Sequence, residues 1–170
     1  MTTLLERPPV EPDWMPMFSE DLVDHLVERR RVATVIEAEC TALVAEMVRR
    51  GAHDDLGYRS MVSLLADRLG VSVAAARGMI RVATALEDMP HTRAGLGRGV
   101  LDLPRVRRLV AARESNPALF REHEPALVDT IAGLPMDHVG RVLDYWCQQA
   151  DLDTVERDAA ALRERRRLFV

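Results

Sequence analysis

Two arginines on one predicted helix are the residues in this sequence best suited to bind a ligand. Arg77 and Arg81 lie four residues apart, a spacing that brings both side chains to one face of a helix. Each guanidinium could bind a phosphate or the edge of a guanine, and Arg68, at the end of the preceding predicted helix, could reach the phosphate backbone. The positions expected to face outward from the second helix are Ser72, Ala74, Arg77, Gly78 and Arg81. These side chains suggest contact with nucleic acid.

These arginines belong to a basic segment within an acidic chain. The formal net charge is −4, which argues against indiscriminate binding to nucleic acid. Residues 59–113 nevertheless contain 10 arginines against 4 acidic residues, whereas residues 1–58 contain 6 against 12 and residues 114–170 contain 7 against 11. Further candidate phosphate-binding side chains in the basic segment are Arg93, Arg98, Arg105 and Arg108, with Arg107 and Arg113 nearby. The coincidence of local positive charge with the two-helix motif favours DNA as the partner.

The residues that usually carry catalysis or bind metals do not form a recognisable motif. The five histidines (His25, His53, His91, His123 and His138) are scattered, and Cys40 and Cys147 have no neighbour at metal-ligand spacing. We expect both thiols to be buried and reduced. The glycines of residues 95–99 lack the Lys-Ser/Thr ending of a phosphate-binding loop, and the glutamates of residues 37–46 lack a Glu-x-x-His partner. The sequence therefore predicts no active site, metal, cofactor or small-molecule substrate.

The two arginines are positioned by a predicted helix-turn-helix at residues 64–86. A first helix runs from Arg59 or Ser60 to Gly70, and a second begins after Ser72. The positions that fit the motif are a small Ala66 between the helices, Gly70 for a positive φ, Val71 as a plug, Ser72 as cap, and Ala76 and Met79 on the inner face. The alternative is a motif that only builds the core, with Ala74, Ala75 and Gly78 packing against another helix.

The remaining elements are also predicted to be helical, which makes the fold all-α: a multi-helix bundle with a long first helix. Residues 1–18 are a flexible proline-rich lead-in, whose Trp14, Met15, Met17 and Phe18 are expected to dock on the body or on a partner. Residues 19–50 form one helix, capped by Ser19, roughly 45 Å long. Its apolar positions are Leu22, Leu26, Ala33, Ile36, Cys40, Leu43 and Met47, interrupted by Arg29, Arg30 and Arg31. So long a helix either spans the domain or projects into a second subunit, as in a homodimer.

After the helix-turn-helix the predicted elements are shorter. Residues 51–57 form a loop, and Thr92 caps a short helix that reaches Gly99. Asp102 caps the next helix; two short elements begin at residues 116–117 and 124–125; a helix covers residues 135–150, and another opens at Asp153 or Thr154. Residues 19–170 are thus expected to be a single helical domain, truncated at its end, where residues 168–170 could begin a strand.

The order of several segments resembles a known actinobacterial family. The matching segments are residues 57–60 (GYRS), 64–66 (LLA), 69–72 (LGVS), 76–77 (AR), 81–86 (RVATAL), 89–92 (MPHT) and 99–102 (GVLD). Over roughly residues 22–170 the chain is similar to the N-terminal helical domain, of uncharacterised function, of the 13E12 repeat proteins of mycobacteria and their relatives. That resemblance implies association with DNA, because full-length members commonly end in an HNH endonuclease domain. The His-rich metal motif of such a nuclease is not found after Asp151.

Three hypotheses follow from the sequence. The first is a non-catalytic module that binds double-stranded DNA mainly through phosphates. The second is a protein-interaction or dimerisation module whose helix-turn-helix is purely structural. The third is the N-terminal part of an HNH nuclease whose catalytic domain is absent here. No signal peptide or apolar run of about 18 residues is present, so we expect a cytoplasmic protein without a membrane partner.

Overall fold

Helices make up all the regular structure of the described chain, as the composition predicted. The computed structural model describes residue 14 and residues 17–167, with side chains described as far as residue 152. The elements are α1 (Ser19–Arg50), α2 (Ala52–Asp55), α3 (Met61–Leu69), α4 (Val73–Ala85), the 3-10 turn η1 (Leu86–Asp88), α5 (Pro90–Gly97), α6 (Leu103–Ser115), α7 (Pro117–Ala132) and α8 (Met136–Arg167). No strand occurs in these ranges, and the all-α prediction is confirmed. Whether residues 168–170 begin a strand lies outside the described residues.

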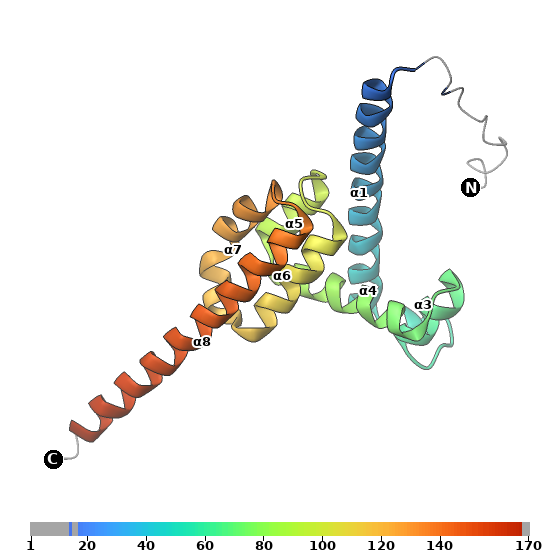
Figure 1. Cartoon of the computed structure of the whole chain (residues 1–170). Helices are drawn as coiled ribbons and strands as arrows, with labels where there is room; N and C mark the ends of the chain where they lie inside the picture. The colour runs from blue at the N-terminus through green and yellow to red at the C-terminus, as the bar shows by residue number, and fades with distance from the viewer. Residues whose placement is uncertain (1–13, 15–16, 168–170) are drawn as a thin grey trace.

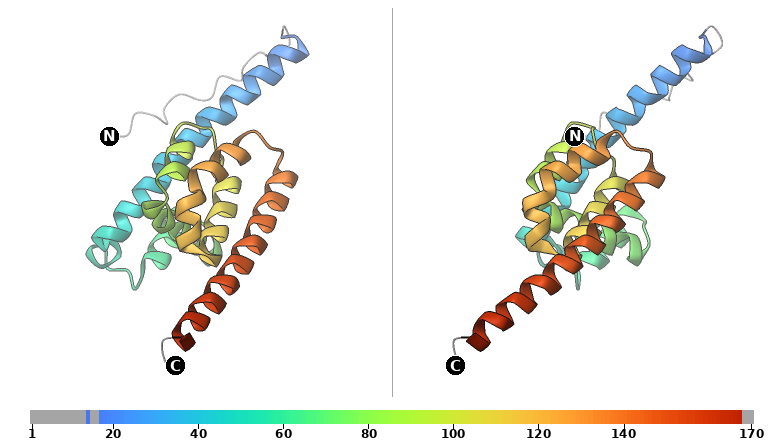
Figure 2. Two further views of the ribbon diagram at one scale, coloured as in Figure 1. Left: turned by 90° about the vertical axis from the view of Figure 1, so that its left-hand side faces the viewer. Right: turned by 60° about the vertical axis from the view of Figure 1, so that its left-hand side comes forward.

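The long helix α1 has the bounds expected from the sequence. It begins at Ser19, but Phe18 occupies the N-cap position and no side chain caps the helix. The acidic residues Glu20 and Asp21 lie in its first turn, where they interact favourably with the helix dipole. Gly51 ends it in the left-handed conformation, at φ 66°. In Figures 1 and 2 the N-terminal part of α1 extends beyond the other helices.

Two apolar clusters hold the helices together, and α4 contributes to both. One cluster joins α4, η1 and the helices α5 to α8, with Met89, Leu101, Val106, Leu109 and Ile131 fully buried. The other joins α1, α3 and α4. Along α4, Ala76 and Ala83 belong to the second cluster, whereas Val82 and Ala85 belong to the first. Helix α4 therefore links the helix-turn-helix to the C-terminal helices (Figure 1).

Several predicted boundaries were wrong. Residues 117–132 form one helix, α7, with Pro125 inside it. Pro125 removes one backbone hydrogen bond, but Phe120 and Ile131, on either side of it, are both buried in the first cluster, and this packing keeps the helix continuous. The predicted break near Asp153 is absent because no glycine or proline interrupts residues 141–167, so α8 continues to Arg167.

Three smaller corrections concern residues near the other predicted ends. Part of the predicted loop of residues 51–57 is the short helix α2. Thr92 does not cap α5, because Pro90 takes the first helical position, which proline favours, and Thr92 is buried within the first turn. Both cysteines are free thiols as expected, but Cys40 is exposed and Cys147 only half-buried.

No single described helix is long and apolar enough to cross a membrane. The segments Met61–Leu69 and Val73–Asp88 reach that length and composition only when taken together, and they are bent by 117° at the turn between them.

Candidate nucleic-acid interface

The turn between α3 and α4 has the geometry of a helix-turn-helix. Gly70 adopts φ 64° and ψ 29°, and its N–H donates to the carbonyl of Asp67 while the N–H of Val71 donates to that of Ala66 at 3.1 Å. This pair of bonds is the Schellman ending of a helix, which requires a left-handed residue such as glycine. The angle of 117° between the helices lies in the range typical of the motif.

Serine side chains fix where both helices begin. The Ser72 hydroxyl oxygen accepts the N–H of Ala75 at 3.1 Å, so Ser72 is the predicted cap of α4. At the start of α3, Ser60 accepts the N–H of Ser63 and its own N–H donates to the Ser63 hydroxyl. The entry to each helix is therefore set by local hydrogen bonds, independently of the rest of the fold.

The inner faces of α3 and α4 pack on the C-terminal half of α1. Leu64, Leu65, Ala76 and Ala83 are nearly inaccessible to solvent, and Val44 from α1 packs among them. This three-helix arrangement leaves the opposite side of α4 uncovered at its N-terminal end. Helix α4 is thus anchored on α1 and α3 along its inner face.

The outer face of α4 is exposed over its first two turns. Val73, Ala74, Ala75 and Arg77 are all exposed, with no covering element. Arg77 makes no ion pair with any described side chain, so its guanidinium is available to a ligand. The predicted outward positions Ser72, Ala74 and Arg77 therefore do share an open surface.

Gly78 does not belong to that open surface. It is half-buried and lines a cavity of about 180 Å³ between α1, α4 and α6, whose other lining residues include Cys40 and Arg107. A Cβ at Gly78 would meet no atom within 4 Å, so Gly78 does face open space as expected, but this space is the cavity beside α1 and the start of α6.

Arg81 is exposed but already has a partner. Its Nε donates to Oε1 of Glu114 on α6 at 2.7 Å, and a second N–H donates to the other carboxylate oxygen. This bidentate pair lowers the pKa of Glu114, chiefly through the hydrogen bond from Arg81. The sequence predicted that Arg77 and Arg81 would be equivalent ligand-binding side chains. In the structure Arg81 is bound to Glu114 on α6, whereas Arg77 has no described ion-pair partner.

Arg68 lies at the C-terminal end of α3, next to a tyrosine. Its guanidinium carbon is 5.9 Å from the centre of the Tyr58 ring, and the Tyr58 hydroxyl donates to Asp67 at 2.5 Å. That hydrogen bond raises the pKa of Tyr58. Arg68 is exposed and lies near the turn.

The other predicted arginines lie beyond α4: Arg93 on α5, Arg98 directly after α5, and Arg105 and Arg108 on α6. Arg105 is half-buried and donates to Asp102 at 2.8 Å and to the carbonyl of Leu134 at 2.6 Å, so it joins α6 to the end of α7. Arg93, Arg98 and Arg108 are exposed. Arg113 pairs with Asp88 at 2.8 Å. Three arginines of the basic segment, Arg81, Arg105 and Arg113, therefore form ion pairs with described acidic side chains.

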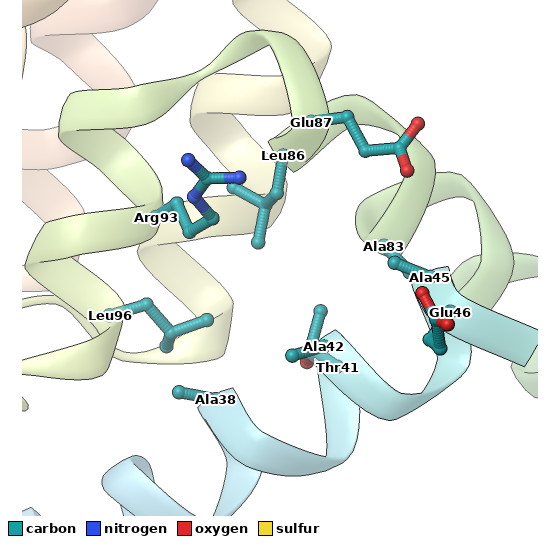
Figure 3. Close-up of a pocket in the computed structure, with 10 residues that line it drawn as sticks. All are labelled: Ala38, Thr41, Ala42, Ala45, Glu46, Ala83, Leu86, Glu87, Arg93 and Leu96. Carbon is teal, nitrogen blue, oxygen red and sulfur yellow. The ribbon is translucent and has the colours of Figure 1, made fainter. Parts of the chain in front are cut away.

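Arg93 borders a second cavity, of about 180 Å³, between α1, α4 and α5 (Figure 3). Its floor is made by small residues of α1, among them Ala38, Ala42 and Ala45, and its rim carries the opposite charges of Arg93, Glu46 and Glu87. Glu46 is bound to Arg49 and Arg50, and this lowers its pKa. No described group of three His, Cys, Asp or Glu side chains is arranged to bind a metal.

Comparison with known proteins gives one match. A family model with the description "Domain of unknown function (DUF222)" matches residues 23–170. No curated protein and no solved structure matches. Because this match covers α1 almost entirely and every later element, the chain belongs to the DUF222 family.

Proposed function

We propose that the chain is a non-catalytic helical module that binds double-stranded DNA through its helix-turn-helix. The observation that carries the proposal is the open N-terminal half of α4, where Arg77 is exposed, has no described ion-pair partner and follows a capped 117° turn. In DNA-binding proteins with this motif, the N-terminal residues of the second helix contact the bases.

The contact is mainly with phosphates. Val73, Ala74 and Ala75, the exposed residues around Arg77, carry no side-chain hydrogen-bond donors, so they can read little beyond thymine methyl groups. Arg77 and Arg68 supply the positive charge at the motif, and Ser72 adds a hydroxyl at the N-terminus of α4, where a phosphate is favoured. Affinity is therefore expected to depend steeply on salt and only weakly on sequence.

The test is a titration of the full chain against random duplex DNA of about 25 base pairs at two or more salt concentrations. Arg77→Ala should weaken binding and reduce the slope of log K against log salt by about 0.9, as expected for one lost phosphate contact. Arg68→Ala should act in the same direction. Arg121→Ala is the matched control, because Arg121 is an exposed arginine on α7. If Arg77→Ala combined with Arg68→Ala binds as tightly as Arg121→Ala, the assignment is wrong.

We further propose that the module works beside a nuclease domain, as in the 13E12 repeat proteins that the chain resembles. This places DNA recognition in the DUF222 part and bond cleavage elsewhere. The supporting feature is the ordered set of segments between residues 57 and 102 by which the chain resembles that family. The genomic reading frame around this sequence tests it: an HNH domain in the same frame supports the proposal, and its absence contradicts it.

A further inference from the structure

Helix α1 carries two rows of apolar residues, and the rest of the described chain leaves the second row uncovered along its N-terminal half. The first row is built from small side chains, Thr34, Ala38, Thr41 and Ala45, which pack towards α4 and α5. The second row carries Leu22, Leu26, Arg29, Ala33, Ile36, Cys40 and Leu43, spaced alternately by four and three residues, and of these Ile36 and Cys40 border the cavity between α1, α4 and α6. This is the spacing of helices that pair along a common seam. Leu26 is 62% exposed, Ile36 54% and Leu43 63%.

The N-terminal half of α1 stands outside the body of the molecule. Every residue from Ser19 to Val32 is exposed except His25, which is half-buried. Gly99, at φ 68°, approaches the backbone and side chain of Arg31, and so marks where the loop before α6 meets α1. Figures 1 and 2 show the helix continuing beyond this point away from the other helices. An isolated helical segment this short is only marginally stable in water, so its apolar residues favour a covering partner.

The described part of the lead-in covers little of this segment. The Trp14 ring lies 5.2 Å from the ring of His25, and with Leu22, Leu26 and Arg29 it surrounds an open hollow. Leu26 remains mostly exposed with Trp14 in place. Next to Leu22 and Leu26, about 100° further round the helix, Val23 and Val27 are 59% and 62% exposed.

Charge along this segment indicates what the partner is. The acidic residues come first, at Glu20, Asp21, Asp24 and Glu28, and the basic residues follow, at Arg29, Arg30 and Arg31. Two copies side by side in parallel would place like charges together. Two antiparallel copies place the arginines of each beside the acidic residues of the other, which lowers the electrostatic energy.

We propose that residues 19–33 of α1 pair with the same residues of a second copy of this chain, antiparallel and centred on Leu26. In this register residue 22 lies level with residue 30 of the second copy. Phe18 lies level with residue 34 of the second copy, which is two residues before the exposed Ile36. It also brings Arg29 within two residues of the level of Asp21. The overlap of 15 residues is about 22 Å long, so the contact is small and the dimer is weak, with a dissociation constant in the micromolar range, about 1–100 µM.

Sedimentation velocity on the full chain, without DNA, tests the pairing between about 5 and 500 µM. The wild type should show a reversible monomer–dimer equilibrium, and Leu26→Glu should raise its dissociation constant at least about tenfold. Leu152→Glu is the matched control, because Leu152 is an equally exposed leucine on α8. A wild type that stays monomeric throughout, or a dimer that Leu26→Glu and Leu152→Glu affect equally, overturns the proposal.

Charge exchange tests the orientation. In an antiparallel pair, Arg29→Glu and Asp21→Arg each weaken self-association, and an equimolar mixture of the two restores it. In a parallel pair, each variant alone keeps the repulsion of the wild type, and the mixture associates more tightly than the wild type. Unchanged association of the single variants therefore refutes the antiparallel arrangement. None of these measurements involves DNA, so a result that contradicts the pairing of α1 is distinct from one that contradicts the proposed DNA binding.

Discussion

Replacing Glu114 should strengthen DNA binding, because Glu114 holds one of the two arginines on the outer face of α4. Glu114→Gln removes the negative charge that pairs with Arg81 while keeping the size of the side chain. The Arg81 and Glu114 side chains are 53% and 45% exposed, and exposed pairs of this kind contribute at most about 1 kcal/mol to stability. The cost of releasing Arg81 is therefore small, and the fold should remain intact.

The gain follows from the salt dependence of phosphate contacts. One additional contact changes the slope of log K against log salt by about 0.9, which at 0.1 M salt corresponds to an upper limit of about eightfold in affinity. The glutamine can still accept a hydrogen bond from Arg81, so the gain in affinity should fall below this upper limit. We expect Glu114→Gln to bind random duplex DNA about three- to eightfold more tightly than the wild type, with a steeper salt slope.

Fluorescence anisotropy at several salt concentrations measures both quantities. Glu122→Gln is the matched control, since it makes the same charge change at an exposed position of α7. Adding Arg81→Ala to Glu114→Gln should abolish the gain, which closes a double-mutant cycle. Equal affinities and slopes for Glu114→Gln and Glu122→Gln would refute the idea that Arg81 becomes a phosphate ligand when released.

Two further predictions concern stability. Glu124 is buried and accepts a backbone N–H in the first turn of α5 at 2.7 Å, so Glu124→Ala should lower the free energy of unfolding by about 2–4 kcal/mol. The exposed neighbour on the same helix, Glu122→Ala, should change it by less than about 0.5 kcal/mol; urea denaturation compares the two. The pKa of Glu114 lies below its ordinary value of 4.5, so its contribution to stability is present above that value and is lost as the pH falls through the lowered pKa. The difference in urea midpoint between wild type and Glu114→Gln should therefore shrink between about pH 5 and pH 3.

The helix-turn-helix could be predicted because its signals are local. Gly70 supplies the left-handed turn residue and Ser72 the cap, and each acts on backbone groups within four residues. The C-terminal end of α1 was predicted for the same reason, since Gly51 terminates the helix by the same backbone conformation. Signals of this range do not depend on how the helices are arranged in space.

The sequence could not predict which arginines bind other groups of the chain, because this depends on contacts between residues far apart in the sequence. Arg81 meets Glu114, 33 positions later, only because α6 packs beside α4. Arg105 meets the carbonyl of Leu134 for a similar reason. The predicted helix boundary at Pro125 was wrong for a related reason. Proline locally favours the end of a helix, but the packing of α7 as a whole keeps the helix continuous. Periodicity identified the apolar positions of α1, but it could not say how far the body would cover each of its two rows.

The proposed pairing of α1 and the proposed DNA contact have a geometric consequence when taken together. Val44 packs against α3 and α4, and it lies 18 residues from Leu26 along the helix. An antiparallel pair centred on Leu26 therefore separates the two helix-turn-helix units by about 54 Å along α1, at 1.5 Å per residue. Dimers that read adjacent half-sites place their recognition helices about 34 Å apart, one turn of DNA. The α1 pair does not match that spacing, so Leu26→Glu should leave the affinity for a single short duplex unchanged. The pairing would instead let one dimer hold two separate stretches of DNA, with each helix-turn-helix bound independently.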